Sequence, residues 1–122
     1  MTMTLLYIED DASNVRLVER ILRRRPDIEV HIAVTGLAGV EAALALRPAL
    51  ILLDNRLPDA SGLEVLGRLA RDPATSAIPI VILSGDTGQA VTRELREAGA
   101  SGFISKPFDI QLFLSEIDRH LT

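Results

Sequence analysis

"ILLDNRLPDASG" (residues 51–62) joins three apolar residues to a carboxylate and then to turn-forming residues. Ile51, Leu52 and Leu53 are typical of a strand that is buried on both faces, as in a parallel sheet covered by helices. A proline and a glycine after Asp54 indicate that the chain turns there. Asp54 therefore ends a buried strand, and a carboxylate in that place needs a positively charged partner.

The rest of the chain repeats this alternation of apolar runs and turns. The apolar runs are residues 4–8, 28–34, 49–53, 78–84 and 101–105, and segments with helical spacing are residues 13–24, 37–46, 62–71, 88–98 and 109–121. Strands that alternate with helices form right-handed crossover units around a parallel sheet. We therefore predict an α/β fold, a doubly wound (βα)5 sandwich with a five-stranded parallel sheet.

The composition limits what such a domain does. Its 122 residues fit one domain, residues 1–122, and with 48% hydrophobic but only 3% aromatic residues the core must be aliphatic. A net charge of −4 argues against direct nucleic acid binding, and the absence of cysteine excludes disulfides and thiolate metal sites. The sequence lacks a signal-peptide start and a membrane-spanning run, so we expect a cytoplasmic domain that contacts no membrane.

Chemically active side chains follow four of the predicted strands, at the edge of the sheet where ligands bind in such folds. They are Glu9, Asp10 and Asp11 after the first strand, Asp54 after the third, Ser84 after the fourth and Lys106 after the fifth. Carboxylates held close together repel unless a cation lies between them, and oxygen ligands suit Mg²⁺. An aspartate beside a metal and a lysine is a nucleophile suited to phosphoryl transfer.

Four spaced motifs resemble those of the response-regulator receiver domains of two-component signalling, which are CheY-like proteins. The motifs are "YIEDD" (7–11), "LILLDNRLPDASG" (50–62), "PIVILSG" (79–85) and "GASGFISKPF" (99–108). The resemblance covers almost the whole chain. It implies a flavodoxin-like sheet with the strand order 2-1-3-4-5.

The resemblance also implies a role for each site residue. Asp54 resembles the phosphoacceptor that takes a phosphoryl group from a histidine kinase or phosphotransfer protein in a Mg²⁺-dependent reaction. The implied metal ligands are Asp10, Asp54, the backbone carbonyl of Arg56 and, through a metal-bound water, Glu9. Lys106 resembles the lysine that pairs with the phosphoryl group, in a Lys-Pro bond that is cis in this family. On this view the domain is no enzyme for other substrates, and catalyses only its own phosphorylation and dephosphorylation.

A conformational switch follows from the same resemblance. Ser84 matches the hydroxyl that turns towards the phosphoryl group, and Phe103 matches the aromatic residue that follows it. The surface formed by residues 88–98, 101–105 and 109–121 would then change its affinity for a downstream protein. The apolar and small residues of 88–98 and 101–105 suit either a homodimer face or ordinary core packing.

Three further charged groups have specific interpretations. Arg56 and Asp86 occupy positions that tune the phosphoryl lifetime in this family, and we hypothesise an ion pair between them that restricts water. Asp11 is better interpreted as a helix cap than as a ligand. The "RRR" of residues 23–25 is interpreted as cations at a helix C-terminus rather than as a nucleic acid site.

Three other functions compete with this interpretation. A pseudo-receiver, which acts by binding alone, would have lost the acid cluster, Asp54 or Lys106, and all are present. A haloacid-dehalogenase-type phosphatase needs a second acid two residues after its nucleophile, where this chain has Arg56. A flavodoxin-like cofactor binder needs a phosphate loop after the first strand, where "EDDAS" would repel phosphate.

Overall fold

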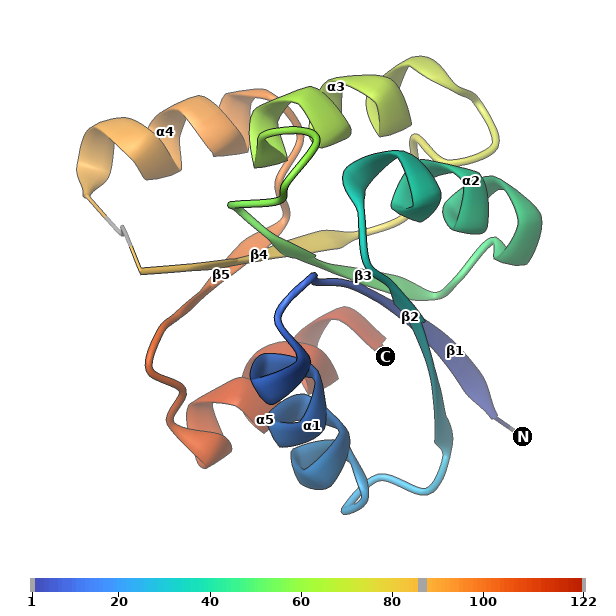
Figure 1. Cartoon of the computed structure of the whole chain (residues 1–122), viewed down its shortest axis with the longest axis vertical. Helices are drawn as coiled ribbons and strands as arrows, with labels where there is room; N and C mark the ends of the chain where they lie inside the picture. The colour runs from blue at the N-terminus through green and yellow to red at the C-terminus, as the bar shows by residue number, and fades with distance from the viewer. Residues whose placement is uncertain (1, 86–87, 122) are drawn as a thin grey trace.

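The computed structural model describes residues 2–85 and 88–121, which form five strands and five helices in strict alternation (Figure 1). The strands are β1 (Met3–Ile8), β2 (Ile28–Ala33), β3 (Leu50–Asp54), β4 (Ile80–Ser84) and β5 (Gly102–Ser105). The helices are α1 (Ala12–Leu22), α2 (Gly36–Leu46), α3 (Gly62–Arg71), α4 (Gln89–Glu97) and α5 (Ile110–Leu121).

The strands form one parallel sheet in the order β2-β1-β3-β4-β5, which confirms the predicted topology. Helices α1 and α5 cover one face, and α2, α3 and α4 cover the other (Figure 1). Every residue of β3 and β4 is buried, whereas the edge strand β2 is half-buried. The order reverses between β1 and β3, so a crevice opens there at the carboxyl ends of the strands.

The core consists of two aliphatic layers, one on each face of the sheet. The layer under α1 and α5 contains the large rings Tyr7 and Phe113, both fully buried. The layer under α2, α3 and α4 contains almost only aliphatic side chains, with Phe103 packed at its margin. Leu, Ile and Val therefore fill most of the core, as the low aromatic content of the sequence predicts.

The element boundaries differ from the predicted ones in places that matter for the site. Asp54 is the last residue of β3 rather than the residue after it, so the strand itself holds the carboxylate in place. Helix α1 ends at Leu22, two residues early, because the N–H groups of Arg24 and Arg25 bond to carbonyls three residues back. Pro26 disfavours a helical conformation at Arg25, so the helix does not resume after this tightened turn.

Two glycines make the close packing of the α2 and α3 layer possible. A Cβ atom on Gly39 would lie 2.5 Å from Cδ1 of the buried Ile8, and one on Gly62 would lie 2.5 Å from Oδ1 of Asn55. Helix α2 therefore approaches β1 closely, and α3 begins directly against the loop that follows Asp54. In residues 2–85 and 88–121, no helix combines the length and hydrophobicity needed to cross a bilayer.

Candidate functional site

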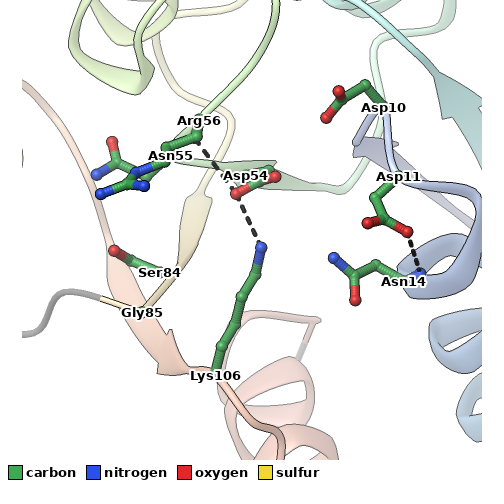
Figure 2. A pocket seen from close by; sticks show the side chains of 9 residues that line it. All are labelled: Asp10, Asp11, Asn14, Asp54, Asn55, Arg56, Ser84, Gly85 and Lys106. Carbon is green, nitrogen blue, oxygen red and sulfur yellow. Dashed lines mark hydrogen bonds and ion pairs between the residues drawn. The ribbon is translucent and has the colours of Figure 1, made fainter.

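The carboxyl edge of the sheet carries a cleft of about 540 Å³ above β1, β3 and β4. Figure 2 shows the side chains that line it, which are Asp10, Asp11, Asn14, Asp54, Asn55, Arg56, Ser84, Gly85 and Lys106. Four segments far apart in the sequence contribute these groups from the strand ends and the residues that follow them, as the sequence predicts. The cleft lies where the sheet order reverses, the usual binding position in this architecture.

Asp54 lies at the centre of the cleft and is paired with Lys106. The Lys106 Nζ donates a hydrogen bond of 3.0 Å to Asp54 Oδ1, and the backbone N–H of Arg56 donates one of 3.3 Å to the same oxygen. Only 6% of the Asp54 surface is exposed. The Lys106–Pro107 peptide bond is cis, as the resemblance implies.

Glu9 lies beneath the cleft and is completely buried. Its Oε1 accepts hydrogen bonds from the Tyr7 hydroxyl at 2.9 Å and from Asn14 Nδ2 at 3.0 Å, and Lys106 Nζ lies 3.7 Å away. Its Oε2 is buried and receives no hydrogen bond from any group in the described part of the chain. A buried oxygen that accepts no hydrogen bond destabilises the folded protein, and binding a proton or a cation would remove this destabilisation.

The electrostatics of Glu9 reflect this position. Burial, together with the neighbouring Asp54 carboxyl, raises the pKa of the Glu9 carboxyl from its usual 4.5 to about 7, against the opposing effects of the Tyr7 hydroxyl and the Lys106 ammonium. Burial and the charge of Glu9 raise the pKa of the Tyr7 hydroxyl far above its ordinary value. Tyr7 therefore stays protonated and donates its hydrogen bond at every physiological pH.

Glu9, Asp10 and Asp54 place one carboxylate oxygen each within 4.8 Å of the others. The sequence predicts this cluster, and the structure brings the three residues together from β3 and the end of β1. Figure 2 shows Asp10 across the cleft from Lys106, with Asp54 between them. Three carboxylates in so small a volume form a group that could hold a metal ion.

Asp11 caps helix α1 and is thereby held away from the cluster. Its Oδ1 accepts hydrogen bonds from the N–H groups of Ser13 and Asn14, at 2.8 and 3.2 Å, which confirms the predicted cap. Sequence reasoning missed Asn14 and Tyr7 as supports of Glu9. Tyr7 carried a signal, since a hydroxyl in a fully buried strand needs an acceptor, whereas Asn14 carried none beyond its place in the first turn of a helix.

The two predicted switch residues lie in different surroundings. Ser84 ends β4, is buried and lines the cleft, and its carbonyl accepts a 3.0 Å hydrogen bond from the Lys106 N–H. Phe103 lies in β5 outside the cleft, half-buried against the second core layer. The guanidinium carbon of Arg96 lies 5.0 Å from its ring centre, a cation–π contact that holds the ring against α4.

Other predicted charges have separate outcomes. Arg56 lines the cleft, but Asp86 lies outside the described residues, so their predicted ion pair stays a prediction. Arg23 is the C-cap of α1 and Arg24 follows it directly, in keeping with the interpretation as cations at the helix C-terminus, whereas Arg25 lies beyond the helix. Arg25 instead pairs with Asp27 and Asp118, because the chain turns back towards α5 there.

Lys106 is the single lysine of the sequence, and the twelve other cationic side chains of this type are arginines. An ammonium is a compact point charge on a flexible stem, whereas a guanidinium is a broad planar fork. Between two carboxylates only 3.0 and 3.7 Å from its nitrogen, a point charge fits where a fork would not. The lysine therefore matches the narrow space above Asp54.

The fold and the cleft define a signalling receiver, and the chain belongs to the response regulator receiver domain family, whose model matches residues 5–118. It is 31% identical to the polar-differentiation response regulator DivK of Brucella ovis, over 99% of this chain and 98% of DivK. It is 34% identical to the response regulator PleD of Caulobacter vibrioides, over the whole of this chain but only 26% of PleD.

A solved structure agrees with these relatives. The chemotaxis response regulator CheY4 of Vibrio cholerae superposes with a TM-score of 0.91 at 25% identity, over 99% of this chain and all of CheY4. Receiver domains are signalling modules that interact with histidine kinases and downstream proteins. The predicted family and fold class are thus confirmed.

Proposed function

We propose that Asp54 is the phosphoacceptor of this domain and that it takes a phosphoryl group from a histidine kinase or phosphotransfer protein in a Mg²⁺-dependent reaction. One Oδ of Asp54 forms the new P–O bond as the bond from phosphorus to the donor nitrogen breaks, and the donor imidazole leaves. The observation that carries the proposal is the position of Asp54, nearly buried but open to the cleft and bonded to the only lysine.

The balance of charge supports a divalent cation as the cofactor. Glu9, Asp10 and Asp54 are three acids facing the single ammonium of Lys106, which leaves up to two negative charges uncompensated. Glu9 Oε2, which has no donor among the described residues, is an atom that a cation or its bound water would satisfy when Glu9 is ionised. We infer that Asp10, Asp54 and the Arg56 carbonyl bind Mg²⁺ directly and Glu9 through water. Bound Mg²⁺ would neutralise charge on the phosphoryl oxygens.

Lys106, Ser84 and Arg56 supply the other groups that phosphoryl transfer needs. Lys106 holds Asp54 in place before the reaction and stays within reach of the phosphoryl oxygens after it. Ser84, at the end of the adjacent strand, supplies a hydroxyl to the same group, and the Arg56 N–H supplies a backbone donor. Such positioning and charge neutralisation are what phosphoryl transfer requires from a protein. The domain thereby catalyses only its own phosphorylation and dephosphorylation.

We further propose that phosphorylation switches the surface of α4, β5 and α5. Movement of Ser84 towards the phosphoryl group would free space for Phe103, which leaves its contact with Arg96 as it turns inward. The changed surface would bind or release a downstream protein. The intact set of Glu9, Asp10, Asp54 and Lys106 argues against a pseudo-receiver that acts by binding alone.

Intact-mass spectrometry tests the proposal. The protein is incubated with phosphoramidate, with and without Mg²⁺, alongside Asp54→Asn and the control Asp59→Asn, which alters an aspartate outside the cleft. We expect one added phosphoryl group in the wild type and in the control, only with Mg²⁺, and none in Asp54→Asn. An adduct that persists in Asp54→Asn would refute the assignment, and no adduct in any variant would favour the pseudo-receiver.

A further inference from the structure

The two carboxylate oxygens of Glu9 have different surroundings. Oε1 accepts hydrogen bonds from the Tyr7 hydroxyl at 2.9 Å and from Asn14 Nδ2 at 3.0 Å, and the Lys106 ammonium lies 3.7 Å from the same atom. Oε2 is buried and accepts no hydrogen bond from any group in residues 2–85 and 88–121. Both oxygens of a carboxylate can accept hydrogen bonds. The donors of this chain therefore engage one oxygen of Glu9 and leave the other for a group that the chain does not supply.

Packing fixes the position of the Tyr7 hydroxyl. Tyr7 is fully buried in β1, and its ring belongs to the core layer under α1 and α5. Side chains two residues apart in an extended chain point to the same face, so the hydroxyl at the end of this ring reaches the carboxylate of Glu9. The position of the ring in the core thus limits where Oε1 can lie.

Asn14 reaches the same oxygen from helix α1. Its side chain lines the cleft, next to Asp11 (Figure 2). Asp11 caps the helix and accepts hydrogen bonds from the N–H groups of Ser13 and Asn14, at 2.8 and 3.2 Å. The cap holds the first turn of α1 in place and, with it, the amide that donates to Glu9. Two donors from two separate elements therefore meet at one carboxylate oxygen.

These contacts exceed what the burial of a hydroxyl requires. A buried hydroxyl needs one acceptor, and a backbone carbonyl suffices. Thr75 is an example, because it is 1% exposed and its hydroxyl donates a 2.7 Å hydrogen bond to the Leu69 carbonyl. The Tyr7 hydroxyl instead donates to an acid of the carboxylate cluster, to which Asn14 donates as well. This arrangement indicates a role in orienting Glu9.

We propose that Tyr7 and Asn14 are positioning residues that set the affinity of the cleft for Mg²⁺. Two hydrogen bonds at Oε1 hold the Glu9 carboxylate so that Oε2 can accept a hydrogen bond from a water bound to the metal. The inference rests on the Mg²⁺ site proposed above and adds the two residues that orient its buried acid. Without them the carboxylate can turn about its last side-chain bond, and the entropy lost in ordering it opposes metal binding.

An NMR titration of the full chain with MgCl₂ measures the affinity for the metal. Tyr7→Phe removes the hydroxyl and keeps the ring, and Asn14→Ala removes the amide donor. Thr75→Val is the matched control, because it also removes a buried, hydrogen-bonded hydroxyl but lies outside the cleft. We expect Tyr7→Phe and Asn14→Ala each to bind Mg²⁺ about threefold to tenfold more weakly than wild type, and Thr75→Val to bind it like wild type.

Two further measurements separate orientation from stability. Urea denaturation without metal should show that Thr75→Val and Tyr7→Phe are both less stable than wild type, so that a difference in Mg²⁺ affinity between them does not follow from stability alone. Glu9→Gln tests whether Tyr7 acts through Glu9. In that background Tyr7→Phe should change the Mg²⁺ affinity by less than about twofold, because the acid that it orients has lost its charge.

The possible failures are distinguishable. Equal Mg²⁺ affinities of wild type, Tyr7→Phe and Asn14→Ala would overturn this inference and leave the proposed metal site in place. No Mg²⁺ binding by wild type would refute the proposed cofactor, and this inference with it. An equal loss of affinity in Thr75→Val would assign the effect to stability and would overturn the positioning role. An undiminished effect of Tyr7→Phe in the Glu9→Gln background would overturn it as well.

Discussion

Replacement of Lys106 by methionine removes the ammonium that the acid cluster depends on. Lys106 Nζ lies 3.0 Å from Asp54 Oδ1 and 3.7 Å from Glu9 Oε1, and the acids themselves are almost completely buried. Methionine keeps most of the volume of the side chain. The variant therefore isolates the effect of charge on the stability of the folded protein.

The expected loss follows from the burial of the pair. Removing one partner of a fully buried ion pair costs about 3–5 kcal/mol, because the other charge is left uncompensated. The Lys106 side chain is 26% exposed, so solvent screens part of the interaction and we expect a loss of about 1–3 kcal/mol without metal. Urea denaturation in the presence of a chelator measures this difference.

Mg²⁺ should then stabilise the variant more than it stabilises the wild type. Without the ammonium the three carboxylates face no positive charge, so a divalent cation binds more tightly. A tenfold gain in affinity adds about 1.4 kcal/mol of stabilisation at saturating metal. The midpoint of unfolding of Lys106→Met should therefore move further with Mg²⁺ than that of the wild type.

Arg93→Met is the matched control, because it removes one exposed cation of α4 and changes the net charge equally. We expect it to lose less than about 0.5 kcal/mol and to respond to Mg²⁺ like the wild type. Equal stability of Lys106→Met and wild type in chelator would refute the assigned role of the ammonium. Equal responses of the two proteins to Mg²⁺ would refute the coupling between lysine and metal.

Three further predictions concern other parts of the molecule. Gly39→Ala should lower the free energy of unfolding by about 1–3 kcal/mol, because its Cβ would meet buried Ile8 at 2.5 Å, whereas Gly67→Ala, whose Cβ would meet only a guanidinium at 3.8 Å, should raise it by about 0.5–1 kcal/mol; urea melts measure both, and equal effects would contradict the packing. Hydrogen bonds from the first N–H groups of α2 hold the pKa of the Asp59 carboxyl below its usual 3.8. The ionised carboxylate therefore stabilises the folded protein at neutral pH, and this stabilisation is lost as the pH falls below 3.8 and through the lowered pKa. Asp59→Asn should thus melt at a lower temperature than wild type at pH 7, and the gap should close in acid; a gap independent of pH would contradict the cap. Arg56→Ala should speed loss of the phosphoryl group if Arg56 restricts water, and an unchanged rate in a mass-spectrometric time course would refute the hypothesis.

The fold could be predicted from the sequence because its signals are local. Two-sided apolar runs, helical spacing and turn residues identify all five strands and helices, and the boundaries fall within two residues of those observed. The early end of α1 is not evident in the sequence because arginine favours helices and no turn residue precedes Pro26. The ion pair of Arg25 with Asp118 is likewise invisible in the sequence, because the two residues are far apart along the chain.

The candidate site was predictable only in part. Residues at strand ends meet because the topology brings them together, so Asp10, Asp54, Ser84 and Lys106 were all placed correctly in the cleft. The complete burial of Glu9 and its bonds to Tyr7 and Asn14 depend on side-chain packing between β1 and α1, which no periodicity reports.

The exposed leucines of α2 could not be predicted from the sequence either. From the sequence alone, "GLAGVEAALAL" is typical of a fully covered helix, and only the structure shows that Leu37 and Leu44 face outward. The arginines of α3 are likewise ordinary helix residues in the sequence. Their position across a groove from Val40 is a tertiary fact.

The most direct test of the central claim is to locate the phosphoryl group chemically. After phosphorylation with Mg²⁺, borohydride reduction converts an aspartyl phosphate to homoserine, and peptide mass spectrometry identifies the altered position. We predict homoserine at residue 54 and at no other aspartate. Homoserine at Asp10 or Asp11 with Asp54 unchanged would contradict the account.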